Sequence, residues 1–178
     1  MNAENFLQSA IQQFKAYKQL GDKTFAQLDD KDFYYAPDAY NNSIAVNITH
    51  LHGNMLSRWT NFLTEDGEKE WRRRDDEFEP HPLLRSELLQ LWDDGWNVLF
   101  NTLHSLSPVN LAQTVYIRTK PVTVIEAIHR QLTHYASHVG QIIFLGKHIK
   151  GAAWKTLSIS KGGSKQFNDS MNQRNDAK

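Results

Sequence analysis

The chain contains no cysteine. Disulfide bonds, a thiolate nucleophile and a thiolate metal site are therefore excluded within this chain. An excess of charge of one sign is also lacking, because 20 Lys and Arg residues balance 20 Asp and Glu residues. A chain without net charge has no overall field that would draw it to nucleic acid or to an anionic membrane, so neither partner is expected.

Long hydrophobic runs are missing as well. No apolar stretch of the sequence approaches the roughly 20 residues that a membrane-spanning helix needs. The first residues lack the basic start and the continuous apolar core of a secretory signal. Together with the absence of cysteine, these features favour a cytoplasmic protein.

Aromatic residues, by contrast, are plentiful. Five Trp, six Tyr and nine Phe residues can build a substantial core, and 178 residues fit one domain. We predict a single domain over residues 1–168, followed by a frayed polar tail at 169–178. Just before this tail, we expect four apolar side chains to pack back on the domain: Trp154, Leu157, Ile159 and Phe167.

Apolar side chains recur three and four residues apart in four segments, which is the spacing of one face of an α-helix. The predicted helices span residues 3–28, 43–63, 83 or 86 to 106, and 122–149. Ser43 and Thr123 are suited to cap the second and fourth. Residues 111–117 alternate enough to predict a short extended segment, with 118–123 as its turn. The predicted fold class is therefore all-α, a four-helix bundle with a short extended insert before the last long helix.

A charged segment, EKEWRRRDDEFEPHP, separates the second and third predicted helices. We expect an ordered surface loop anchored by Trp71 and Phe78. Its charges can simply pair with one another in solvent. Alternatively, Arg72, Arg73 and Arg74 help to shape a site or bind an anionic group of a substrate.

His134 and His138 lie four residues apart in HYASH, so on a helix both imidazoles point to the same side. This spacing allows both to bind one metal ion. Two boundary histidines that bond to neighbouring groups are the plainer interpretation. A third ligand has to come from another helix, and THLHGN offers His50 and His52. The position of His50 at the edge of its apolar stripe favours His50, whereas His52 suits a packed or surface role.

Other residues near these histidines are weaker candidates. Asn54 could orient His50 or a metal-bound water, and Gln131 and Gln141 could do the same beside the helical pair. Arg58 and Trp59 could form a wall of the site, although a surface Arg and a core Trp are the simpler interpretation. The remaining histidines are poor ligand candidates by position: His81, His104, His129 and His148.

Three long segments carry a resemblance to a known family: NSIAVNITHLHGNMLSRWTNFLTEDGEKEWRRRDDEFE, TVIEAIHRQLTHYASHVGQIIFLGKHIKG and WKTLSISKGGSKQFN. They resemble the DinB/YfiT-like superfamily of four-helix-bundle metalloenzymes, and within it a subfamily of unknown function. The resemblance implies a metal triad at His50, His134 and His138, with zinc or nickel as the divalent metal. It also implies a homodimer, and relatives that include thiol-dependent transferases and a mycothiol-dependent isomerase.

Three neutral imidazoles without a thiolate leave coordination positions open, as in catalytic rather than structural metal sites. A metal held in this way lowers the pKa of bound water to about 7 or binds an incoming thiol as thiolate. We therefore expect a metal-dependent enzyme that acts on a small molecule, either a thiol S-transferase or a hydrolase. The alternative is a non-catalytic bundle that is stabilised by metal or binds a small molecule.

Overall fold

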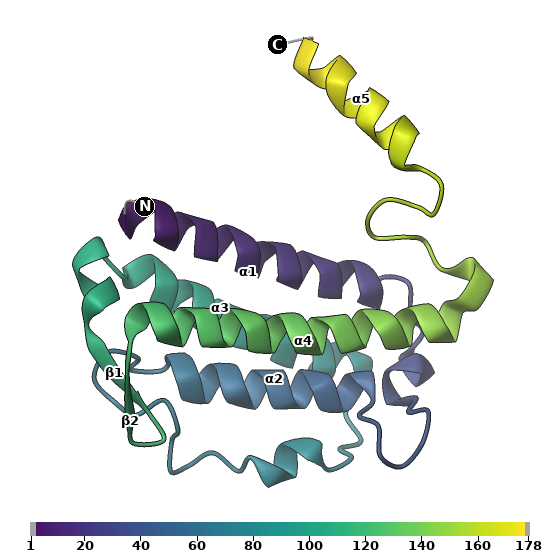
Figure 1. Cartoon of the computed structure of the whole chain (residues 1–178). Helices are drawn as coiled ribbons and strands as arrows, with labels where there is room; N and C mark the ends of the chain where they lie inside the picture. Colours follow the sequence, from purple (N-terminus) through teal and green to yellow (C-terminus); the bar gives the residue numbers. More distant parts are fainter. Residues whose placement is uncertain (1–2, 177–178) are drawn as a thin grey trace.

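The computed structural model describes residues 3–176, which are mostly helical with one small two-stranded sheet (Figure 1). The α-helices and strands of this part of the chain are α1 (Ala3–Phe25), α2 (Ile44–Trp59), α3 (Arg85–Ser105), β1 (Thr114–Ile117), β2 (Lys120–Thr123), α4 (Val124–Lys150) and α5 (Ser164–Asp176). The predicted all-α class is confirmed in this coarse form. None of the described helices is both long enough and apolar enough to cross a membrane.

The two helices that carry the candidate histidines begin at the caps that the sequence predicts. The Ser43 hydroxyl accepts a hydrogen bond from the backbone N–H of Val46 at 3.2 Å. At α4, Thr123 accepts from the N–H of Glu126 at 3.2 Å, and the Glu126 carboxylate accepts from the N–H of Thr123 at 2.6 Å. This reciprocal pair satisfies two donors that a helix start leaves without partners, so both helices have fixed starting points.

Some predicted boundaries are too long. The structure ends α1 at Phe25 rather than residue 28, and α2 at Trp59 rather than residue 63. Asn61 has a φ of 49°, a left-handed conformation that cannot continue a right-handed helix. Residues 122 and 123 were predicted as helix but belong to β2, because they pair with β1.

The extended insert is a hairpin, in which β1 pairs antiparallel with β2. Arg118 and Thr119 form its two-residue turn with φ values of 52° and 64°, the left-handed conformation that tight hairpins require. The Asp66 carboxylate accepts from both turn N–H groups, at 2.8 Å from Arg118 and 2.6 Å from Thr119. This anchor ties the hairpin to the segment that follows α2 and fixes the position of Arg118.

Helices α1 to α4 run alongside one another around one apolar core (Figure 1), with close packing of α2 on α3 and of α1 on α4. Phe14 of α1 lies among three buried rings, with centroid distances of 6.3 Å to Trp59, 6.4 Å to Trp96 and 5.9 Å to Tyr135. Because these rings come from all four helices, the aromatic cluster fixes α2 and α4 relative to each other.

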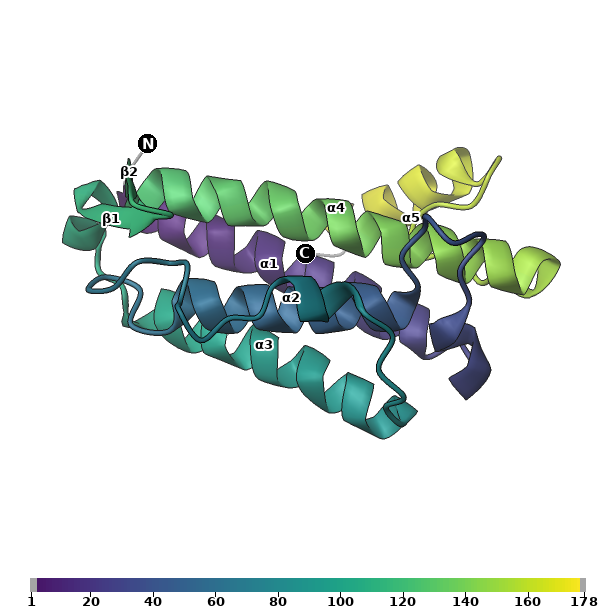
Figure 2. The ribbon, with the colours of Figure 1, turned by 90° about the horizontal axis from the view of Figure 1, so that it is seen from below.

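The segment between α2 and α3 runs along the outer side of α2 (Figure 2) and includes a short 3-10 helix, η2 (Asp75–Phe78). Its predicted anchors behave differently. Phe78 packs against His50 with 4.7 Å between ring centroids. Trp71 is 57% exposed, so the prediction that it anchors the segment was wrong. Two ionic side chains of the segment are buried instead, Lys69 at 8% and Glu77 at 9% exposed.

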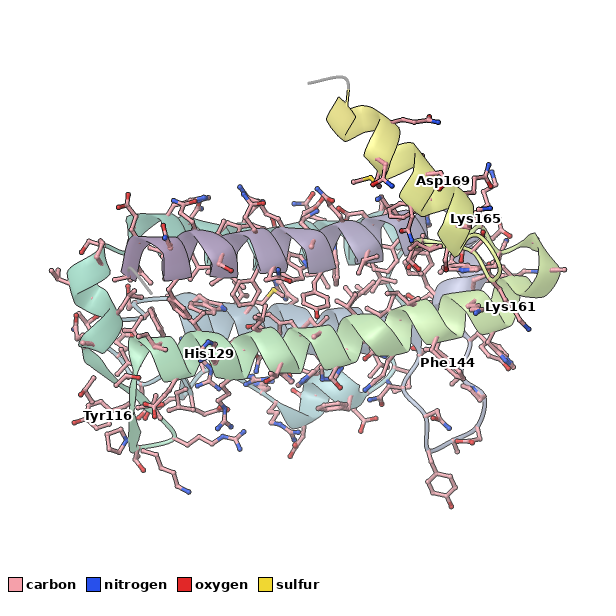
Figure 3. The ribbon with its side chains drawn as sticks, turned by 45° about the horizontal axis from the view of Figure 1, so that its top comes forward. Tyr116, His129, Phe144, Lys161, Lys165 and Asp169 are labelled. Carbon is pink, nitrogen blue, oxygen red and sulfur yellow. The ribbon has the colours of Figure 1, made fainter. Side chains whose placement is uncertain are left out.

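The C-terminal part differs most from the prediction. Residues 164–176 form α5, which projects away from the other helices (Figure 1), where we expected a frayed tail from residue 169. Figure 3 shows its Lys165 and Asp169 apart from α1 to α4. Ile159 and Phe167 are 42% and 45% exposed, so they do not pack back as predicted, whereas Trp154 and Leu157 are half-buried. Residues 177 and 178 of the predicted tail lie outside the described residues.

Candidate metal centre

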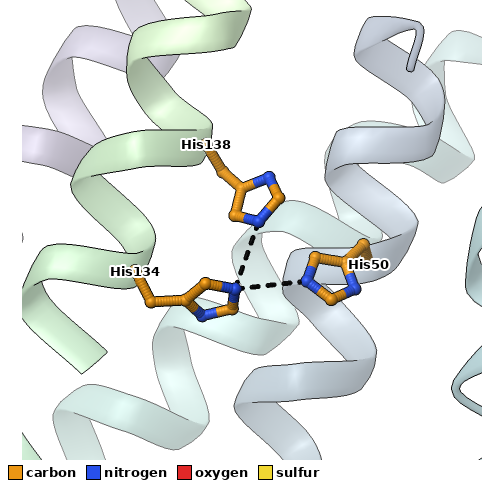
Figure 4. Close-up of side chains that lie close together, drawn as sticks. All are labelled: His50, His134 and His138. Atoms are coloured by element: carbon orange, nitrogen blue, oxygen red, sulfur yellow. Dashed lines mark hydrogen bonds between the residues drawn. The ribbon is translucent and has the colours of Figure 1, made fainter. Parts of the chain in front are cut away.

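Three histidine side chains meet between α2 and α4 (Figure 4). His50 comes from α2, and His134 and His138 come from successive turns of α4. The Nε2 atom of His134 lies 3.3 Å from that of His50 and 3.1 Å from that of His138. One ligand atom from each histidine lies within 4.8 Å of the other two. The structure thus brings together the three histidines that the sequence analysis selected.

The two Nε2 separations at His134 suit a shared cation. Three imidazole nitrogens bound to Zn²⁺ lie about 2.9–3.4 Å apart for ligand angles between a right angle and a tetrahedral angle. Without a cation, a proton on His134 can bridge only one of its two close nitrogen pairs. A metal ion at the centre satisfies all three nitrogens, so the donor set fits a metal better than it fits a hydrogen-bond network.

Two of the rings are held in the orientation that a metal ligand needs. The Nδ1 of His50 donates to Glu77 Oε2 at 2.9 Å, and the Nδ1 of His138 donates to Asn47 Oδ1 at 2.8 Å. Asn47 also donates through its Nδ2 to the Ser43 carbonyl at 2.9 Å, which fixes its amide oxygen toward His138. Since Nδ1 carries the proton in both rings, Nε2 presents its lone pair to the centre.

Two of the imidazoles, those of His134 and His138, are also held neutral. Burial, followed by the neighbouring His138 and His50, lowers the pKa of His134 from 6.5 to about 3. Burial and the neighbouring His50 lower the pKa of His138 to about 4. At neutral pH these two rings are unprotonated at one nitrogen, which is the form that binds a metal.

Glu77 connects the histidines to an arginine. Arg72, whose side chain is 2% exposed, donates to both carboxylate oxygens of Glu77 at 2.7 and 2.8 Å. Burial alone would raise the pKa of Glu77, but the hydrogen bonds from Arg72 and His50 outweigh it and hold that pKa below its usual value. Glu77 therefore stays ionised and orients His50 through a charged hydrogen bond. Neither Glu77 nor Asn47 was expected from the sequence as a partner of these histidines.

A glycine makes room for Glu77. A Cβ atom on Gly53, one turn after His50 on α2, would lie 2.2 Å from Glu77 Oε1. A glycine inside a helix costs roughly 1 kcal/mol relative to alanine. The close approach of Glu77 explains why this helix carries one. The glycine in THLHGN was the sequence signal that another chain segment approaches α2 beside His50.

We predict opposite effects for two glycine-to-alanine changes in helices. Gly140→Ala in α4, where an added Cβ meets nothing within 4 Å, should stabilise the protein by about 1 kcal/mol. Gly53→Ala should destabilise it by about 1–3 kcal/mol, because Glu77 must leave His50 and Arg72. Urea unfolding in the presence of a chelator measures both changes. Equal stabilisation by the two substitutions would contradict the tight packing of Glu77 on α2.

A cavity of about 540 Å³ opens beside the three histidines. Phe78, Asn54 and Gln131 form part of its wall, and the charged side chains that line it are five arginines: Arg58, Arg72, Arg74, Arg118 and Arg130. Among the described residues that line this cavity, none is Asp or Glu. The cluster is therefore reachable by a small molecule through a positively charged space.

Of the other predicted site residues, some line the cavity and one does not. Asn54 and Gln131 line the cavity, but Asn54 accepts from the Tyr135 hydroxyl at 3.1 Å rather than orienting His50. Gln141 is exposed and lines a different hollow. Arg58 is 3% exposed, so the simpler interpretation of a surface arginine was wrong, and it forms part of the wall.

The structure also shows where the arginines of the charged segment and the remaining histidines lie. Arg72 supports the site through Glu77, Arg74 lines the cavity, and Arg73 has a side chain that is 86% exposed. His52 is half-buried with its backbone next to Gly95 of α3, outside the cluster. His129, which is labelled on α4 in Figure 3, packs against Phe6 of α1. All four remaining histidines are exposed: His81, His104, His129 and His148.

Fold and site together define a mostly helical protein with a three-histidine cluster that could hold a metal ion. The chain belongs to the DUF1572 family, described as a protein of unknown function, whose model matches residues 1–163. No curated protein and no solved structure matches the chain.

Proposed function

We propose that this chain is a metal-dependent enzyme of the DinB/YfiT-like superfamily, with the four-helix bundle of that superfamily. His50, His134 and His138 hold one divalent metal ion, zinc or nickel. The substrate is a small molecule, and the activated group is a water molecule or a low-molecular-weight thiol. The observation that carries this proposal is the convergence of three imidazole nitrogens, with two of the rings oriented by hydrogen bonds at Nδ1.

Two features support a catalytic rather than a structural metal, and a third bears on which metal it is. Structural zinc sites are closed by four protein ligands, whereas catalytic sites use three and keep a position for water or substrate. Here the donors are three imidazoles, and a cavity of about 540 Å³ adjoins them. An all-imidazole donor set suits zinc and nickel better than magnesium or calcium, which prefer oxygen ligands.

The residues of the chain have distinct roles in this proposal. A divalent ion bound by the triad supplies Lewis acidity and lowers the pKa of a water molecule or thiol that reaches it. Glu77 and Asn47 hold the rings of His50 and His138 in the ligand tautomer. Because no Asp or Glu of the described chain lines the cavity, the lining offers no carboxylate base. A proton released by water or a thiol that binds at the triad would pass to solvent or to the substrate itself.

The test is the metal content of the untagged protein. We expect one zinc or nickel ion per chain by elemental analysis. Reloaded protein is then assayed with a low-molecular-weight thiol and an electrophile, and separately with hydrolysable esters or amides in the absence of thiol. Thiol consumption assigns a transferase and hydrolysis a hydrolase. Bound metal without turnover favours the non-catalytic bundle, and a metal-free protein contradicts the proposal.

Two further expectations belong to the same proposal. The superfamily resemblance predicts a homodimer, which sedimentation equilibrium measures directly. A small thiol partner and a chain without cysteine both fit the cytoplasm. A monomeric protein with full metal content would remove the dimer from the proposal and leave the metal site intact.

A further inference from the structure

The cavity beside the triad is unusual in its charge. Five guanidinium groups line it without a carboxylate among the described lining residues. Such a surface attracts anions, and low-dielectric walls strengthen the attraction. The arginines are not needed to hold the three histidines, apart from Arg72, which acts through Glu77. Their presence therefore calls for a separate explanation.

Arg58 and Arg130 lie on the same side of the triad, toward one end of the cavity. His50, Asn54 and Arg58 follow one another at intervals of four on α2, so they share one side of that helix. Arg130 and His134 repeat this spacing on α4. At 1.5 Å per residue, Arg58 lies about 12 Å along its helix from His50, and Arg130 about 6 Å from His134. A small molecule can reach the triad and the arginines at once.

Arg58 is the buried member of this group and is poorly compensated. Its side chain is 4% exposed, and its Nε and Nη1 atoms are buried without a hydrogen-bond partner in the described chain. Its Nη2 lies 3.9 Å from Glu68 Oε2, an oxygen that also contacts Arg72 at 3.5 Å and Arg118 at 3.2 Å. A buried cation with one distant, shared counter-charge is costly unless a ligand supplies the missing charge.

The neighbouring arginines add to the surplus. Arg130 is exposed at the cavity and makes no ion pair with any residue that the structure describes. Arg118 is fixed at the cavity edge by the hairpin turn that Asp66 holds. Burial lowers the pKa of Arg58, and the positive charges of Arg130 and Arg72 act in the same direction. An anion between Arg58 and Arg130 would offset both the burial of the Arg58 charge and the repulsion from the neighbouring arginines.

We propose that the arginine end of this cavity binds an oxyanion group of the substrate, a carboxylate or a phosphate, with Arg58 and Arg130 as its anchors. In calling this ligand a substrate, the inference rests on the proposed function. The geometry gives the substrate a reactive group at the triad and an anionic group one to two helical turns away. Guanidinium groups suit both oxyanions because they donate paired, planar hydrogen bonds.

Inorganic phosphate and succinate are the probes. Each is titrated into the full-length protein at constant ionic strength, with chloride as the balancing anion, and binding is measured by calorimetry. We expect Arg130→Gln and Arg58→Gln each to weaken binding about tenfold or more. Arg73→Gln is the matched control, because its exposed side chain lies outside the cavity, and its affinity should equal that of the wild type. If Arg58→Gln fails to fold, the exposed Arg130 carries the test.

A second arm separates the anion site from the metal. His134→Gln protein, which lacks a triad nitrogen, should still bind the probe with the same dependence on Arg130. Binding in that background supports the anion site even where the metal proposal fails. Tighter binding of phosphate assigns a phosphorylated substrate, and tighter binding of succinate a carboxylated one. Absence of binding by both probes, or an equal loss in Arg73→Gln, overturns the inference while leaving the metal result unaffected.

Discussion

His134→Gln should abolish metal retention. We expect metal affinity to fall by more than about a hundredfold, because loss of a residue that hydrogen-bonds to a metal ligand already costs about 10- to 100-fold. His134 is the central member of the cluster, since its Nε2 makes both of the close contacts, at 3.3 and 3.1 Å. Glutamine approximates the size and neutrality of the imidazole but removes the nitrogen donor. Elemental analysis of untagged protein and competition with a chromophoric chelator measure the loss.

His52→Gln is the matched control for that experiment. It changes the same residue type on α2, two residues from His50, but His52 lies outside the cluster. Metal content should therefore equal that of the wild type. Circular dichroism of both variants checks that the helices persist. Wild-type metal content in His134→Gln would place the ion elsewhere in the chain and contradict the three-histidine centre.

Glu77→Gln should have the second-largest effect, and it should act on metal and stability together. The substitution removes the charge that holds Arg72, whose side chain is 2% exposed. Leaving a buried cation without its partner costs about 3 kcal/mol, the lower end of the usual range, because Glu68 still contacts Arg72. The weakened hydrogen bond to His50 should lower metal affinity about 10- to 100-fold. Urea unfolding of the metal-free protein and chelator competition measure the two effects separately.

Glu79→Gln provides the comparison, since it makes the same chemical change two residues later at an exposed position. Glu79→Gln should leave the free energy of unfolding and the metal affinity unchanged. Loss of stability without loss of metal affinity in Glu77→Gln would reduce Glu77 to a partner of Arg72. Loss of both stability and metal affinity is expected only when the Glu77 carboxylate also orients the His50 imidazole.

Sequence periodicity predicted much of the fold because helices α1 to α4 bury one side each. The spacing of four and three residues that places Ile44, Ile48 and Leu51 in the core also places His50 at the edge of that stripe. Local spacing was therefore enough to select His134 and His138 as candidates from the sequence. The selection of His50 required its edge position together with the family resemblance. Helix α5 escaped prediction because its polar residues carry no apolar period, although local backbone hydrogen bonds still form a helix.

The supporting residues could not be predicted in this way. Glu77 lies in an irregular segment, and its contact with His50 spans 27 residues. Arg58 looked like a surface arginine because residue type alone does not reveal that the hairpin and the charged segment cover it. Such contacts depend on how loops fold over helices, which neither periodicity nor capping encodes. Only the glycine of THLHGN hinted at the approach of Glu77.

The position of Glu77 has a consequence for the segment between α2 and α3. His50 binds this segment with one ring nitrogen and faces the centre of the triad with the other. A cation at Nε2 polarises the ring and makes Nδ1–H a stronger donor to Glu77. A cation held by the three histidines would link its own binding to the order of this segment through one coupling free energy, which acts equally in both directions.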